Sequence, residues 1–391
     1  MLAAALLATG CDGDDAGDEA PRGAAALSAP AVKLRADLSG ALAARAWLTT
    51  FSVRATLADG TTSPTARAAR RTLGEGSKAL ASRLAIASGE KTAADAFVLL
   101  QRQDKLWAAV ARARASRNTV AGTVADVGLD ANRAALAKTL AIDGLTAGEL
   151  GEQLEPGDTS LAAAVDAVAA GAPRAPARTA VAAARATRPA AALVRAAARR
   201  RPQITGGATS PAAELAALAA TAFTDDAYAQ AATDAVVVAG ATRGVRLRTA
   251  ARTLDEATDT LGQFVASVYG EDAGGRLAAL WSAHTVAFTD YARAKVNADA
   301  VVAQRALLAL KRFRAGTLKL LDELDPEGPR GKLSAALTKH VDTVTAAIRA
   351  QATDSPKVGP RLLAAAGAAR AVGRALAVRF AGQFPERLPA S

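Results

Sequence analysis

RTLGEGSKALASRLAIASGEKTAADAFVLLQRQDKLWAAVARA, residues 71–113, aligns without a gap with RTLDEATDTLGQFVASVYGEDAGGRLAALWSAHTVAFTDYARA, residues 252–294. The same residue type recurs at points along the whole length: Thr72 and Thr253, Leu73 and Leu254, Glu75 and Glu256, Leu80 and Leu261, Gly89 and Gly270, Glu90 and Glu271, Leu99 and Leu280, and Ala111-Arg112-Ala113 and Ala292-Arg293-Ala294. An internal repeat constrains the fold, because both copies are expected to adopt the same structure.

The correspondence extends beyond both ends of the two stretches. Upstream, Pro30 stands opposite Pro211 and Leu34 opposite Leu215; downstream, after a shift of two residues, Gly148 pairs with Gly331, Leu150 with Leu333 and Pro202 with Pro385. We therefore predict a first copy over residues 30–205, a linker at 206–210 and a second copy over 211–391. The linker, GGATS, contains glycine and serine, which interrupt a helical pattern.

Apolar residues recur with a helical period in both copies. One predicted face collects Leu277, Leu280, Trp281, His284, Ala287, Phe288 and Tyr291, and another collects Leu333, Leu337, His340, Val341, Val344 and Ile348. Turn-forming residues at Asp59-Gly60, Ser88-Gly89, Asp143-Gly144, Gly270, Pro326–Pro329 and Ser355-Pro356 divide each copy into roughly five or six helices. The sequence thus predicts an all-α protein made of two tandem, internally repeated helical bundles.

The composition also favours closely packed helices. Of the 391 residues, 51% are hydrophobic but only 4% are aromatic, so Ala, Leu and Val must build the core. Alanine is the strongest helix former, and its small side chain lets helix axes approach closely. Beyond the N-terminus no stretch has the roughly 18 uninterrupted apolar residues of a spanning helix, so we expect a soluble body.

The chain opens MLAAALLATGCDGDD, in which its one cysteine, Cys11, separates a short apolar run from a cluster of aspartates. LLATGC resembles the bacterial lipobox, whose cysteine is acylated and becomes the mature N-terminus. The basic residues that usually open a secretory signal are missing. We expect a lipoprotein-type signal at 1–10, lipidation of Cys11, a tether at 11–29 and a lipid-anchored, extracytoplasmic position in the cell envelope. The alternative is an unstructured Ala-rich N-terminus with a chance cysteine.

Positive charge is concentrated in one segment. The formal net charge is +11, and residues 173–202 include arginines but no acid. Five of these arginines have a helical spacing that would align them in one stripe: Arg178, Arg185, Arg188, Arg195 and Arg199. Such a stripe could meet anionic lipid or cell-wall polymers beside the anchor. The alternative is a solvated face, and Pro189 interrupts the helix. We expect no nucleic-acid partner, because no aromatic residues are interleaved to stack on bases.

The second copy resembles a known family. Its TLDEATD…YARA segment, with the later LTKHVDTVTAAIRAQA and the closing RFAGQFPERL, is similar to exported bacterial proteins with two copies of a helical unit. Members of this family, whose activity is unknown, show a YG-E-A-x-x-L-x-x-LW-x-x-H-I core, an x-x-H-V helix and a closing QFP-(D/E)-(R/K). The resemblance covers most of 211–388 well and 30–205 loosely.

Some members of that family carry the name copper amine oxidase, an activity that the residues here do not support. A copper amine oxidase is an all-β enzyme with three copper-binding histidines and an Asn-Tyr pair that yields its quinone cofactor. This chain has two histidines, and its tyrosines, Tyr228, Tyr269 and Tyr291, follow Ala, Val and Asp.

The resemblance also implies a set of metal-ligating positions. In the family, one histidine often stands in the first helix of a copy, and two more stand on the later helices described above. These positions hold Asp226, His284 and His340 in the second copy, and Arg45, Gln103 and Gly157 in the first. Asp and His can bind zinc, copper or non-haem iron, here with Tyr291 as a neighbour. The alternative is that both histidines are hydrogen-bonded core residues.

Motifs of known catalytic chemistry are missing. The sequence has no Gly-x-Ser-x-Gly elbow, no P-loop and no dinucleotide fingerprint after a predicted strand. We therefore expect a non-catalytic binding or envelope-associated module without a cofactor. A metal-binding bundle, with its site in the second copy, is the alternative.

Overall fold

The computed structural model describes residues 22–240, 244–328 and 330–387, and over these ranges the protein is all-α, which confirms the predicted fold class. The N-terminal part comprises α1 Arg22–Ser28, α2 Pro30–Asp59, α3 Pro64–Ser88, α4 Glu90–Ala115, α5 Thr119–Leu140, α6 Ala147–Ala169, α7 Ala175–Ala186 and α8 Pro189–Arg200. The C-terminal part comprises α9 Pro211–Val238, α10 Val245–Tyr269, α11 Glu271–Val296, α12 Ala300–Leu324, α13 Gly331–Ala352, α14 Val358–Gln383 and the 3-10 turn Pro385–Arg387. Cys11 and the predicted signal lie outside the described residues.

The helix bounds follow the register of the two aligned stretches. α2, α3, α4 and α5 begin 181 residues before α9, α10, α11 and α12, respectively. α14 spans 26 residues, and the corresponding segment of the first copy is divided into α7 and α8. Pro189 causes this division: it stands at the first position of α8, where its missing N–H leaves no helical hydrogen bond unmade.

Local sequence determines where the helices start and stop. Ser63 and Ser210 accept hydrogen bonds from the backbone N–H groups of Ala66 and Ala213, which caps α3 and α9 at their N-termini. Gly89 and Gly270 separate α3 from α4 and α10 from α11 with φ values of 98° and 90°, a conformation that side chains other than glycine rarely adopt. The predicted turn signals therefore mark real helix ends.

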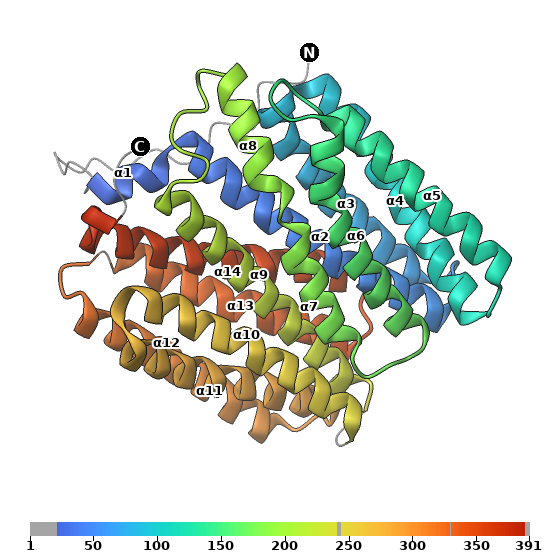
Figure 1. The fold of residues 1–391 in the computed structure, drawn as a ribbon. Coiled ribbons are helices and arrows are strands. Elements are labelled where there is room, and N and C mark those ends of the chain that lie inside the picture. The colour runs from blue at the N-terminus through green and yellow to red at the C-terminus, as the bar shows by residue number, and fades with distance from the viewer. Residues whose placement is uncertain (1–21, 241–243, 329, 388–391) are drawn as a thin grey trace, which may run out of the picture.

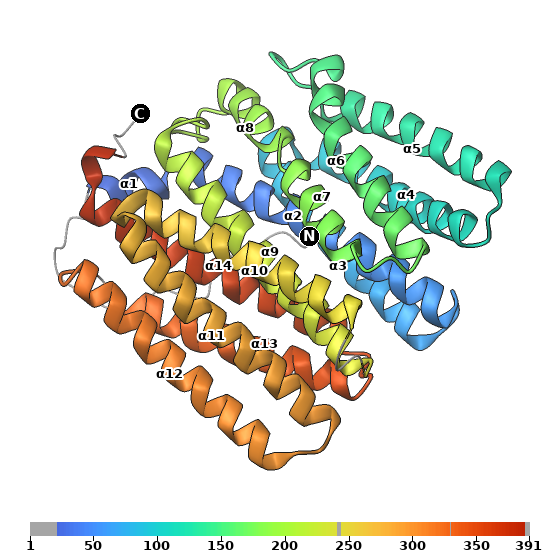
Figure 2. The same ribbon diagram turned by 60° about the horizontal axis from the view of Figure 1, so that its bottom comes forward.

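α2 and α9, the first helices of the two copies, pack against each other in the middle of the protein (Figure 1). Their equivalent residues Trp47 and Tyr228 stack with ring centroids 6.1 Å apart and planes inclined by 14°. One continuous cluster of buried apolar side chains includes residues of both copies, and a second cluster lies within the first copy and its junction. The hairpins α4–α5 and α11–α12 form opposite outer edges (Figure 2). The division into two bundles stays a prediction.

The predicted linker at 206–210 lies against the start of α2. The N–H of Ala31 donates to Thr205 O at 3.0 Å, and Arg35 Nη1 donates to Ala208 O at 2.7 Å. Ala208 is itself buried. Within the predicted tether, α1 packs against α14 and buries Leu27. Both segments are thus attached to the helical body.

Hydropathy along the helices is moderate. Within the described ranges, none of the helices combines the length and the apolar character that crossing a bilayer requires.

Candidate functional site

Two histidines meet in the interior of the second copy. His284 on α11 and His340 on α13 are each 1% exposed, and their Nε2 atoms lie 3.2 Å apart. Trp281 stacks on the His340 ring, and Phe313 stacks on the His284 ring with centroids 4.3 Å apart. Helical spacing predicted that both histidines face the core, but only the packing of α11 against α13 brings them together.

Hydrogen bonding fixes the protons of this pair. Burial lowers the pKa of His340 to about 4, and burial together with the neighbouring His340 lowers the pKa of His284 well below its usual value, so both rings are neutral at pH 7. His284 Nδ1 lies 2.7 Å from Trp281 O and must donate to it, which leaves its Nε2 as an acceptor. His340 Nε2 therefore donates to His284, and His340 Nδ1 keeps a lone pair with no partner among the described residues.

Asp226 on α9 is buried but does not join the histidines in a common ligand group. Its side chain is near the Trp281 indole, and burial raises its pKa to about 7; the indole offsets part of this rise although it lies outside hydrogen-bonding geometry. Within the ranges that the structure describes, no three His, Cys, Asp or Glu side chains gather closely enough to hold a metal ion. Tyr291 is buried farther along α11, where the Lys295 amine lies 5.2 Å from its ring centroid.

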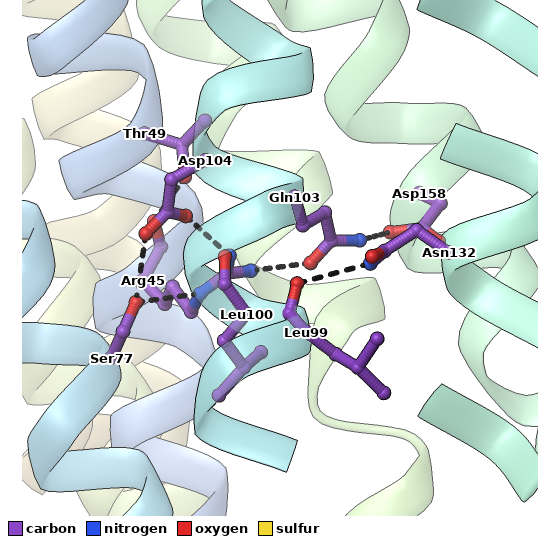
Figure 3. A network of polar contacts seen from close by, with 9 residues as sticks. All are labelled: Arg45, Thr49, Ser77, Leu99, Leu100, Gln103, Asp104, Asn132 and Asp158. Atoms are coloured by element: carbon purple, nitrogen blue, oxygen red, sulfur yellow. Dashed lines mark hydrogen bonds and ion pairs between the residues drawn. The ribbon is translucent and has the colours of Figure 1, made fainter. Parts of the chain in front are cut away.

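The equivalent positions of the first copy form a charged centre (Figure 3). Arg45 on α2 donates to Gln103 Oε1 at 2.9 Å and to Ser77 Oγ at 3.2 Å, and it forms an ion pair with Asp104. Gln103 Nε2 in turn donates to Asp158 Oδ1 at 3.1 Å. The sequence alignment places Arg45 and Gln103 at matching positions but does not predict that they touch. Asp104 and Asp158 belong to no motif, and all these contacts depend on how α2, α4 and α6 pack.

Burial and the charge of Arg45 have opposite effects on the pKa values of two carboxyl groups in this charged centre. Burial raises the pKa of Asp158 to about 6 and also raises the pKa of Asp104, while the Arg45 charge opposes both shifts. Gly157, the third matching position, lies where α6 approaches α7: an added Cβ would come within 3.0 Å of Ala186 Cα. The first copy therefore has a hydrogen-bonded charge network where the second has two neutral imidazoles.

α9 carries two further carboxyl groups, the half-buried Asp225 and the buried Asp234. Asp225 Oδ1 accepts from Trp47 Nε1 at 3.0 Å, and Asp234 Oδ1 accepts from Gln230 Nε2 at 2.8 Å. Burial raises their pKa values to about 7 and about 8, respectively, and these hydrogen bonds offset part of the rise. Groups with such shifts often mark functional sites, although structural networks produce them as well.

The predicted arginine stripe is distributed over two helices. All five arginines are exposed: Arg178 and Arg185 on α7, Arg188 between the helices, and Arg195 and Arg199 on α8. Arg185 Nη1 donates to Ser160 Oγ at 2.9 Å. Both helices pack against α2, and they lie next to each other in the ribbon (Figure 1).

The chain matches no family model, no curated protein and no solved structure.

Proposed function

We propose that the protein is a non-catalytic binding module of the cell envelope, lipid-anchored outside the cytoplasm through Cys11, whose arginine face binds phosphate-bearing anions of the envelope. The arginine face is defined as Arg178, Arg185, Arg188, Arg195 and Arg199. The observation that carries the proposal is the exposure of all five in a segment, 173–202, that contains no acid.

Elementary electrostatics supports this assignment. Each Lys or Arg close to an anionic lipid surface contributes about 1 kcal/mol of binding free energy, and the effect fades within a Debye length. Five such charges within residues 173–202 would act together once the lipid anchor holds this segment close to the surface. Lipid headgroups and wall polymers share phosphate chemistry, so the experiment must separate these two sources.

The test uses the full chain with Cys11→Ser, which removes the lipid anchor. Sedimentation with vesicles of phosphatidylglycerol and phosphatidylcholine is compared with sedimentation on phosphatidylcholine alone and with binding to soluble polyphosphate. We expect salt-sensitive binding to the anionic vesicles that is lost when the five arginines of the face become glutamine. A matched control changes five other exposed arginines to glutamine: Arg102, Arg112, Arg305, Arg312 and Arg361.

A greater loss of vesicle binding when the arginine face is changed than when the five control arginines are changed supports the proposal. Equal loss with both sets would reduce the effect to net charge and would overturn the assignment. Binding to polyphosphate without binding to vesicles would assign the face to a wall polymer.

A second candidate function, metal binding in the second copy, rests on the separation of the two imidazoles alone, because Asp226 does not join them. Two nitrogens bound at 2.0–2.1 Å to one tetrahedral ion stand about 3.3–3.4 Å apart, and the Nε2 atoms of His284 and His340 are 3.2 Å apart. His340 could free its Nε2 lone pair by moving its proton to Nδ1, which has no partner among the described residues.

Elemental analysis of the full chain tests this second candidate. We expect about one equivalent of a transition metal that is lost in His284→Gln with His340→Gln, while Gln103→Ala in the first copy retains it. A folded, metal-free protein, or metal retained by the double variant, would rule out a site at this pair.

A further inference from the structure

A large cavity opens where the two copies meet at one end of the bundle. Its volume is about 780 Å³, within the range of about 300–1,000 Å³ that is usual for small-molecule sites. The C-terminal parts of α2, α9 and α13 and the N-terminal parts of α3, α10 and α14 form its walls. The cavity therefore requires helices from both the N-terminal and the C-terminal part of the chain.

Apolar side chains make up most of the lining. Leu48 and Phe51 come from α2, Val236 and Val238 from α9, and Leu362 from α14, with alanines between them. Burying apolar ligand surface against such a wall contributes about 25 cal/mol per Å². The wall therefore suits a hydrocarbon body rather than a sugar or a nucleotide.

The Arg54 side chain lies beside this apolar space. The Arg54 guanidinium lies over the Phe51 ring, with Cζ 5.0 Å from the ring centroid. Arg54 is exposed to solvent. Asp59, Asp354 and Arg246 also line the cavity, but no carboxylate of the described residues forms an ion pair with Arg54.

We propose that this cavity binds a long-chain carboxylate, with the hydrocarbon chain against the apolar wall and the carboxylate on the guanidinium of Arg54. Arg54 forms no ion pair with a carboxylate of the described residues, and a bound carboxylate would give its guanidinium a partner of opposite charge. The planar guanidinium fits both oxygens of one carboxylate. Of the two aspartates and two arginines that line the cavity, Arg54 is the one whose charged group lies over a ring of the apolar wall, that of Phe51.

Calorimetric titration of the full chain tests the proposal with two ligands of equal chain length and opposite head charge. Below their micelle concentrations, dodecanoate should bind at one saturable site, and dodecyltrimethylammonium should bind about tenfold more weakly or not at all. Arg54→Met should weaken dodecanoate binding by about tenfold or more, the effect of losing one charge-assisted hydrogen bond. Arg54→Lys should restore part of the affinity.

Two controls separate the cavity from the rest of the surface. Arg102→Met removes an exposed arginine on α4 and should leave binding unchanged. Ala235→Phe places a ring in the cavity wall and should weaken both ligands, with unchanged helicity by circular dichroism. No saturable binding, or equal binding of the two ligands that is unaffected by Arg54→Met, would overturn the proposal.

Discussion

The indole Nε1 of Trp47 donates a hydrogen bond of 3.0 Å to Oδ1 of Asp225, and this bond joins the first helices of the two copies. It is the polar counterpart of the stacking between Trp47 and Tyr228 on the same pair of helices. The contact between α2 and α9 therefore has both an apolar component and a directional one.

Replacing Trp47 by Phe should destabilise the protein by more than the loss of ring volume alone. Without the indole donor the half-buried Asp225 carboxyl loses this hydrogen bond, which costs about 1 kcal/mol. The matched control is Trp107→Phe, because Trp107 is equally buried at 1% exposure but its N–H has no partner among the described residues. Urea unfolding at pH 8 measures both variants; equal losses would contradict a role for the hydrogen bond.

Asp234 should make the protein less stable as the pH rises. Its folded pKa, about 8, lies above the ordinary value of an aspartate, 3.8. Between these values the folded state keeps a proton that the unfolded state releases, so the free energy of unfolding falls with pH, by at most about 1.4 kcal/mol per pH unit. The loss is absent below about pH 4 and complete above about pH 8.

Asp234→Asn removes this titration and keeps an oxygen for Gln230 to donate to. The variant should gain stability over the wild type between pH 5 and pH 8, measured by urea unfolding across that interval. The control, Asp342→Asn, changes an exposed carboxylate on α13. If the stability gained by Asp234→Asn does not grow with pH, Asp234 does not titrate between pH 5 and pH 8, which would contradict the prediction.

Breaking the charged centre of the first copy should be costly. Arg45→Met leaves Asp104 and Asp158 without their counter-charge, and removing one partner of a buried pair costs about 3–5 kcal/mol. The double variant Arg45→Met with Asp104→Leu should recover part of that loss, since no unpaired charge then remains at position 104. Thermal unfolding is the measurement, with Lys91→Met as the control because the Lys91–Asp95 pair is exposed. No recovery in the double variant would exclude the buried charge as the cause.

Gly270 and Gly275 should respond to alanine in opposite directions. Gly270 has φ 90°, so alanine there is strained and should cost about 1–2 kcal/mol even though its Cβ would have room. Gly275 is exposed within α11, where alanine should add about 0.4–1 kcal/mol. Thermal melts of the two single variants test the pair; a stabilising Gly270→Ala would contradict the assigned conformation.

The sequence was informative about elements and poor in information about contacts between them. The helical period and the turn residues around Gly89 and Gly270 predict the fold class and several helix ends, because both depend on short-range backbone preferences. Pro189 predicts the break between α7 and α8 for the same reason. These features require no knowledge of how the helices pack.

The polar interior depends on packing and could be predicted only in part. The facing of His284 and His340 toward the core follows from their helices, but their 3.2 Å contact depends on how α11 and α13 cross. The ion pair between Arg45 and Asp104 has no sequence signal, since an arginine in an Ala-rich helix is indistinguishable from an exposed one until its partner helix is placed. The cavity around Arg54 needs six helix ends from both copies.

Trp47 meets Tyr228, the residue at the matching position of the aligned sequence, and residues on the axis of a two-fold symmetric dimer meet in the same way. A gene duplication that fused two subunits of an ancestral homodimer would preserve this contact, and residues 206–210 suffice to join them. In a homodimer every substitution enters both subunits at once. Fusion ends that coupling, so one half could acquire the charge of Arg45 while the other kept a neutral pair of imidazoles.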